Sequence, residues 1–165
     1  MYITEYYGLA ELVYPDIFLS HHDRQWILWR RFDDRFLKTA DQIHNDFGAT
    51  YLNTWSFGKL PYFGDQIFSF SCVRPHVMPD GEKWSVDTMH IDWNTGDFKI
   101  VKYCDLSIED KKQAYNEARN FIIKHPKKYP YVTALESGDY APTWVHLSTG
   151  NFKHEDGSIR IIKPS

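Results

Sequence analysis

The chain has 165 residues, of which 42% are hydrophobic and 17% aromatic, and its net charge is −3. This length supports one domain with a substantial core, and the slightly acidic charge lacks the basic excess of a nucleic-acid-binding protein. No apolar run is long enough to span a bilayer, and the opening MYITEYYGL has neither the basic nor the apolar region of a secretory signal. We therefore expect a single domain over residues 1–165 that binds neither nucleic acid nor membrane.

The first third of the chain is predicted to be helical. Residues 1–32 favour short, irregular helical turns interrupted by the sequence YPD at 14–16. Between residues 33 and 47 the apolar side chains recur at the spacing of one helix face, at Phe36, Ala40, Ile43 and Phe47. Gly48 follows where a glycine commonly ends a helix, so this segment is predicted to be an amphipathic helix.

The period then changes to that of strands. Strands are predicted at 49–57, 66–73, 86–93 and 97–103, and the sequence NTG at 94–96 is predicted to be the turn of a hairpin between the last two. Cys72 and Cys104 do not form a metal-binding C-x-x-C pair and are interpreted as small core residues, with a disulfide between them as the less favoured alternative.

The last third begins with a second helix. Ser107 is a good N-cap with Asp110 three residues later, and the helix is predicted to run to about Lys124 before Pro126. Strands follow at 131–136, 143–148 and 158–163. A helix, several strands, a helix and more strands indicate an α+β fold with a mainly antiparallel sheet and flanking helices.

Two histidines lie in strand-like segments with aromatic neighbours: His90 in VDTMHIDW and His146 in TWVHLS. They are either two ligands of one metal site or ordinary polar residues on half-buried strands. His90 and Asp92 point to the same face of an extended strand, which makes Asp92 a candidate partner.

In their order and spacing these segments resemble the phage-encoded branch of the zinc D-alanyl-D-alanine carboxypeptidase-like peptidases, which have the Hedgehog/DD-peptidase fold. The resemblance covers nearly the whole chain. It rests on the segments GLAELVYPDIF, DFG, LNTWSFG, VRP, YPYVTALE and TWVHLS. It implies that fold, a zinc ion held by three protein ligands, and peptidoglycan as the substrate.

The family binds zinc through a motif similar to S-x-H-x-x-G-x-A-x-D and a later histidine in a W-x-H strand. The resemblance makes His90 the first ligand and His146 the second, and it gives Arg74 in VRP the place of the arginine that holds the substrate. Aligned through the following helix start, the motif aspartate falls on Ile100. Gly96 follows His90 by six residues rather than three.

A second register makes Asp92 the third ligand but puts Ser85 in place of the first histidine. Asp92 or Asp97 would complete the set if the predicted hairpin bends back. The general base expected before the second histidine is Glu136 or Asp139. Where the family commonly has an aspartate two residues after that histidine, this chain has Ser148.

Two functions follow from the resemblance. The incomplete ligand set favours a non-catalytic phage protein that keeps the fold without zinc, as a virion component or a module that binds peptidoglycan or phage structural proteins. The alternative is an active zinc peptidase that cuts peptidoglycan with His90, His146 and a substitute carboxylate. Either is expected in the virion or the host cytoplasm, and a complete His/Asp/His set would favour the enzyme.

Overall fold

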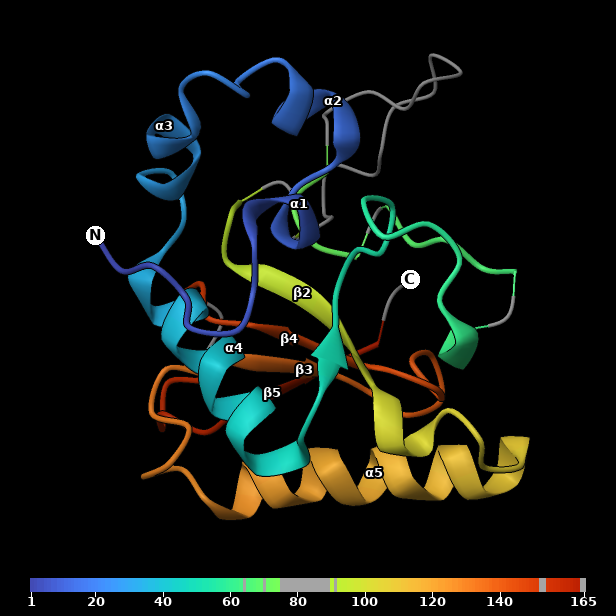
Figure 1. Ribbon diagram of the computed structural model, residues 1–165. Coiled ribbons are helices and arrows are strands. Elements are labelled where there is room, and N and C mark those ends of the chain that lie inside the picture. Colours follow the sequence, from blue (N-terminus) through green and yellow to red (C-terminus); the bar gives the residue numbers. More distant parts are fainter. Residues whose placement is uncertain (64, 70, 75–89, 91, 152–153, 164–165) are drawn as a thin grey trace.

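A computed structural model describes residues 1–63, 65–69, 71–74, 90, 92–151 and 154–163. Its centre is a five-stranded sheet in the order β1-β2-β4-β3-β5, in which β3 and β5 pair in parallel and the other neighbours pair antiparallel (Figure 1). The strands are β1 (Thr50–Tyr51), β2 (Thr95–Ile100), β3 (Ala134–Glu136), β4 (Val145–Ser148) and β5 (Arg160–Ile162). The α+β prediction is confirmed, with a mixed sheet because the last strand pairs in parallel.

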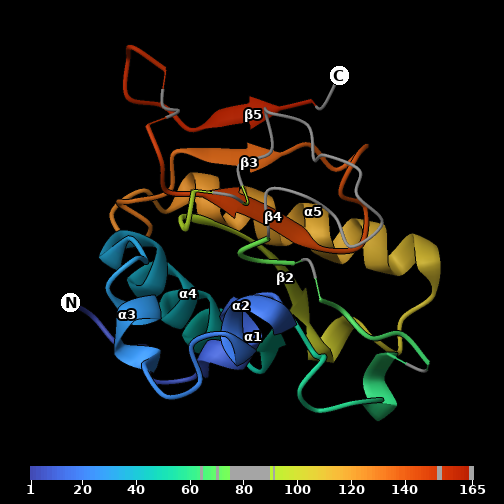
Figure 2. The same cartoon turned by 90° about the horizontal axis from the view of Figure 1, so that it is seen from above.

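Within the described residues, two long α-helices and three short ones accompany the sheet. The short helices α1 (Leu9–Leu12), α2 (Pro15–Leu19) and α3 (Gln25–Trp29) lie together at one side of the molecule (Figure 2). The helix α4 (Asp34–Phe47) follows them, and α5 (Ile108–Lys124) runs below the sheet in Figure 1.

Local capping chemistry determines α4. The Asp33 carboxylate accepts a hydrogen bond from the backbone N–H of Arg35 (2.9 Å) and caps the first turn. At the other end Gly48 has a φ of 80°, a conformation that suits glycine, and its N–H donates to the His44 carbonyl (2.9 Å). The predicted helix is therefore confirmed at both ends.

The second predicted helix is confirmed in the same way. The Ser107 hydroxyl accepts a hydrogen bond from the backbone N–H of Asp110 (3.2 Å), and Glu109 and Asp110 place negative charge in the first turn of α5. Tyr115, Ala118 and Ile122 are buried on its inner face.

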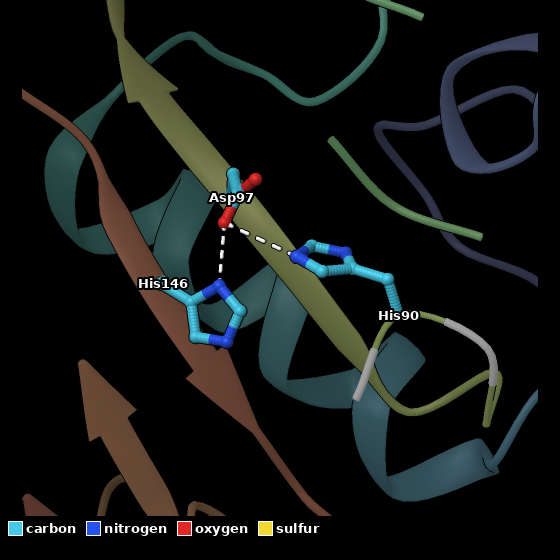
Figure 3. A group of neighbouring side chains, drawn as sticks. All are labelled: His90, Asp97 and His146. Carbon is cyan, nitrogen blue, oxygen red and sulfur yellow. Dashed lines mark hydrogen bonds and ion pairs between the residues drawn. The ribbon is translucent and has the colours of Figure 1, made fainter. Parts of the chain in front are cut away.

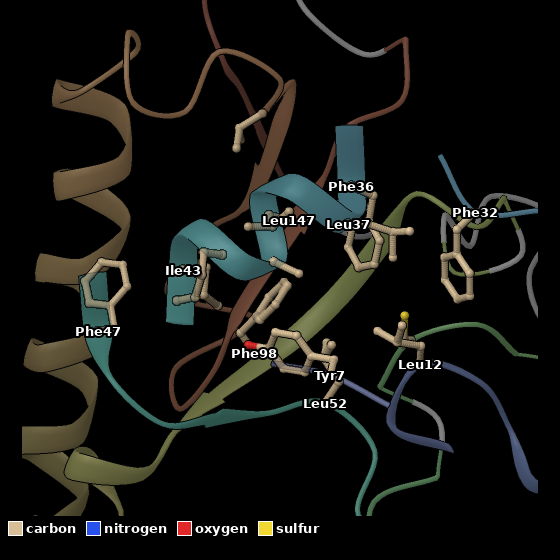
Figure 4. Packing of buried hydrophobic residues seen from close by; sticks show 14 of the residues in the cluster. Tyr7, Leu12, Phe32, Phe36, Leu37, Ile43, Phe47, Leu52, Phe98 and Leu147 are labelled. Carbon is tan, nitrogen blue, oxygen red and sulfur yellow. The ribbon is translucent and has the colours of Figure 1, made fainter. Parts of the chain in front are cut away.

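Alternate side chains of strand β2 point to the two faces of the sheet. Phe98 and Ile100 are fully buried on the helix side, where Phe98 packs among the side chains of α4 (Figure 4) and the Ile100 N–H donates to the Tyr115 hydroxyl of α5 (2.8 Å). Because strand side chains alternate, Asp97 and Lys99 point to the opposite face. The candidate site lies on that second face.

The segment between β1 and β2 differs from the prediction. Of the strand predicted at 49–57 only β1 forms, and the described residues of the strand predicted at 66–73 are irregular. Side chains and single backbone hydrogen bonds hold this segment in place of a strand ladder: the side-chain Oδ1 of Asn53 accepts from the Ser71 N–H (2.8 Å), and the Thr54 hydroxyl accepts from the Phe68 N–H (2.9 Å). A buried polar side chain can replace a strand partner in satisfying backbone groups.

The turn predicted at 94–96 is also wrong. Thr95 and Gly96 belong to β2, where they pair with Ser148 and Leu147 of β4, and the chain turns at residues 92–94. The pairing with β4 decides where the strand begins, because it satisfies the backbone of both residues. Most of the strand predicted at 86–93 lies outside the described residues.

The two cysteines are free thiols, Cys72 buried and Cys104 partly buried. Within the described part of the chain, no helix has both the length and the apolar character required to cross a membrane.

Candidate metal centre

Three buried side chains on the second face of the sheet converge: His90, Asp97 and His146 (Figure 3). One potential ligand atom from each lies within 4.8 Å of those of the other two. Asp97 comes from β2, His146 from β4, and His90 from the segment that leads into the turn before β2. The predicted pair of histidines is therefore brought together, with Asp97 between them.

The sheet register places Asp97 directly opposite His146. As a result the Asp97 Oδ1 lies 2.6 Å from His146 Nδ1, a short hydrogen-bond distance. His90 reaches the same oxygen from the other side, with its Nε2 at 3.5 Å. One carboxylate oxygen thus faces both imidazoles.

A hydrogen bond behind the site orients His90. Its Nδ1 lies 3.0 Å from the carbonyl oxygen of Cys72, which can only accept, so Nδ1 carries a proton and Nε2 is directed towards Asp97. Burial lowers the pKa of His90 to about 4, although Asp97 opposes this shift, so the ring is neutral at pH 7. A neutral imidazole fixed by a carbonyl behind it is the form that binds a metal.

Asp97 is ionised. Burial by itself raises the pKa of this carboxyl, but the effect of the two histidines lowers it by more than burial raises it. The net pKa lies well below its usual value. On the outer side, Asp97 Oδ2 lies 3.4 Å from Nη2 of Arg74, whose side chain is only 16% exposed. The carboxylate is therefore held between a cation and the two imidazoles.

This set fits a divalent metal. Two imidazoles and one carboxylate are the ligand types of a catalytic zinc site, which uses three protein ligands and keeps one position for water or substrate. Binding requires deprotonated ligands, and both the neutral His90 and the ionised Asp97 meet this requirement before any ion enters. The chemistry of the donors thus agrees with the zinc site that the resemblance implies.

Of the two predicted general bases, Glu136 lies at the cluster. It is the last residue of β3 and is half-buried; burial raises the pKa of its carboxyl, and His146, Asp97 and Arg74 are close enough to affect it. Asp139 is exposed, in the turn after β3. Glu136, unlike the exposed Asp139, is thus a half-buried carboxylate within electrostatic reach of the cluster.

The third candidate ligand that the fold brings to the two histidines is Asp97 rather than Asp92 or the residue at position 100. Asp92 is exposed and lies outside the cluster, and Ile100 is buried on the opposite face of β2. Trp93, the residue after Asp92, has a φ of 59°, so the chain turns back there. This turn carries residue 97 rather than residue 92 to the histidines.

Counting the motif without a gap identifies the same residue. In S-x-H-x-x-G-x-A-x-D the aspartate follows the histidine by seven residues, and Asp97 follows His90 by seven. The motif glycine then falls on Trp93, whose positive φ is a conformation that favours glycine. Taking Gly96 as the motif glycine made the spacing look stretched and concealed the match.

A cavity of about 600 Å³ reaches strand β2 at Lys99, and its described lining does not include the three residues of the cluster. Lys99 of β2 and Trp144, which precedes β4, contribute to its lining, and each lies two residues from a member of the cluster. Residues two apart on a strand share a face, and the Lys99 ammonium donates to the Asp97 carbonyl oxygen (3.3 Å), so this end of the cavity lies next to the backbone of Asp97. Its volume lies within the range of ligand-binding pockets.

Comparisons of this chain with protein-family models, with curated proteins and with solved structures give no match. The case for a function therefore rests on the cluster and its surroundings.

Proposed function

We propose that this chain is a zinc-dependent peptidase whose metal ligands are His90, Asp97 and His146. The observation that carries the proposal is the convergence of these three buried side chains on one point, with ligand atoms within 4.8 Å. The substrate class that we propose, following the resemblance to the D-alanyl-D-alanine carboxypeptidase-like peptidases of the Hedgehog/DD-peptidase fold, is a peptide bond of bacterial peptidoglycan next to a D-amino acid.

When bound, zinc supplies Lewis-acid chemistry, lowering the pKa of a water molecule and polarising the carbonyl to be attacked. Glu136 accepts the proton of the attacking water. Its raised pKa suits this task because a general base works best when its pKa approaches the operating pH. The proton then passes to the leaving amine.

Arg74 supplies fixed positive charge beside the ligands. It lies against Asp97 at 3.4 Å, and its backbone N–H donates to the His90 carbonyl (3.3 Å), so the arginine is tied to two of the three ligands. A guanidinium in this position can stabilise the negative charge that develops on the substrate oxygen. This agrees with the place of the substrate-holding arginine in the family that the chain resembles.

The complete set reverses the preference drawn from the sequence. A non-catalytic virion component was favoured because the third ligand was missing, and Asp97 removes that reason. Phage origin, peptidoglycan as substrate and a place in the virion or host cytoplasm remain part of the proposal through the resemblance alone.

The test is the zinc content of protein purified without chelator, measured by elemental analysis. We expect about one zinc per chain in the wild type, loss of zinc in His146→Ala and Asp97→Asn, and wild-type content in His154→Ala, which removes an exposed histidine. Absence of zinc from the wild type, even after incubation with zinc salts, would overturn the proposal. Zinc binding without release of peptide fragments from peptidoglycan would leave the metal centre intact and refute the substrate.

A further inference from the structure

The cavity lined by Lys99 and Trp144 carries positive charge in its described wall. Among its described lining residues are two lysines and no aspartate or glutamate. Most of the rest of its wall is aromatic. The lining consists of Phe63, Gln66, Phe68, Lys99, Tyr103, Cys104, Lys111, Tyr115, Thr143 and Trp144. Positive charge between aromatic walls attracts an anion strongly, because the low local dielectric weakens screening.

Lys99 is the central cation. Its side chain lies on the site face of β2, and the residue is only 8% exposed. The ammonium donates to the Ser71 hydroxyl and to the Asp97 carbonyl oxygen (3.3 Å), and it lies 4.3 Å from the centre of the Phe68 ring. Both hydrogen-bond partners are neutral, and among the described residues the Asp97 carboxylate attracts the ammonium without forming an ion pair with it. A buried ammonium with neutral partners gains much from an added anion.

We infer that this cavity is the subsite for an acidic side chain of the peptide substrate, whose carboxylate binds to Lys99. The inference rests on the proposed function, because it takes the cavity as the substrate cleft of the peptidase. Lys111 of α5 also lines the cavity and adds a second positive charge to it. The cavity volume of about 600 Å³ exceeds what a single carboxylate needs, so the peptide continues past Lys99.

The spacing on β2 positions the acidic residue. Lys99 is two residues from Asp97, a distance of about 7 Å along a strand. An extended peptide advances about 3.5 Å per residue. The carboxylate therefore belongs to a residue one or two positions from the bond that is cut.

The test measures binding of three acetylated dipeptides to protein dialysed against EDTA, so that neither zinc nor catalysis enters. The probes are acetyl-D-Glu-D-Ala-amide, its neutral counterpart acetyl-D-Gln-D-Ala-amide, and acetyl-D-Gln-D-Ala with a free terminal carboxylate. The readout is the NMR shift of the Trp144 indole N–H, assigned with Trp144→Phe.

We expect the glutamate dipeptide to bind at least tenfold more tightly than the neutral one. Lys99→Met should reduce this preference to less than twofold, and Lys111→Met should reduce it in part. Lys112→Met is the matched control on α5: this lysine pairs with Glu109 (2.8 Å) on the exposed surface and should leave the preference unchanged.

Equal binding of the acidic and neutral dipeptides to the wild type would overturn the inference, as would an undiminished preference in Lys99→Met. Tighter binding of the terminal carboxylate than of the glutamate side chain would assign the subsite to a chain end and overturn it as stated. If circular dichroism shows that Lys99→Met is unfolded, Lys111→Met decides, and a full preference there refutes the inference. If the protein prefers the acidic dipeptide but never binds zinc, the subsite stands and the proposed peptidase is refuted. If it binds zinc but shows no preference for the acidic dipeptide, the metal centre stands and the subsite is refuted.

Discussion

Replacing Asp97 by asparagine tests the centre most directly, because the change keeps the shape of the side chain and removes its charge. In the metal-free protein the carboxylate contacts His146 at 2.6 Å and Arg74 at 3.4 Å, and all three groups are largely buried. Removing one partner of a buried pair leaves the other charge uncompensated, at a cost of about 3 kcal/mol. For a chain of this size that corresponds to a fall in Tm of roughly 6–12 °C.

The same variant reports on the metal. Zinc in thousandfold excess over its Kd stabilises the folded state by about 4 kcal/mol, which raises the Tm by roughly 8–16 °C. We expect this rise in the wild type and not in Asp97→Asn. Thermal unfolding followed by circular dichroism, in EDTA and then in zinc, measures both effects.

Asp92→Asn is the matched control. It makes the same chemical change five residues away, at an exposed position outside the cluster, and should leave the Tm and its response to zinc unchanged. The reasoning is refuted if Asp97→Asn in EDTA unfolds within about 2 °C of the wild type, or if the two variants respond equally to zinc.

Three further predictions concern Glu11, Gly96 and Glu136. Burial raises the pKa of Glu11 to about 7, so folding favours its protonated form, and the resulting stability is present below pH 4.5 and lost as the pH rises to 7. Glu11→Gln should therefore be more stable than the wild type at pH 8, by at most about 3 kcal/mol, and equal to it at pH 4, as urea unfolding at both pH values would show. Gly96→Ala should lower the free energy of unfolding by about 1–3 kcal/mol, because its Cβ would lie 2.6 Å from Leu52 and 3.0 Å from Phe36; an unchanged urea midpoint would contradict this. Glu136→Gln should retain zinc but lower kcat on peptidoglycan by about 10²–10⁴-fold, and full activity would exclude it as the base.

The two long helices were predictable because their determinants are local. The Asp33 and Ser107 caps, the glycine at 48 and the apolar spacing between them act within a few residues of one another. Propensity and capping suffice to place a helix when they agree over such a span.

The strands were less predictable because their ends depend on partners far away in the sequence. Thr95 and Gly96 look like turn residues, yet pairing with Ser148 and Leu147 extends β2 through them. Strand preference reflects the neighbours that a residue meets more than the residue itself.

The site divides in the same way. By residue type and by resemblance, the sequence alone singled out His90, His146 and Arg74. It left the general base open between Glu136 and Asp139, and the third ligand open between Asp92 and Asp97. The tertiary structure decided that Asp97 joins them, because a ligand set requires atoms within a few ångströms, and that distance is set here by the β2–β4 register and by the turn at Trp93. Asp97 follows His90 by seven residues and precedes His146 by 49 residues. Only the folded sheet brings the three side chains together.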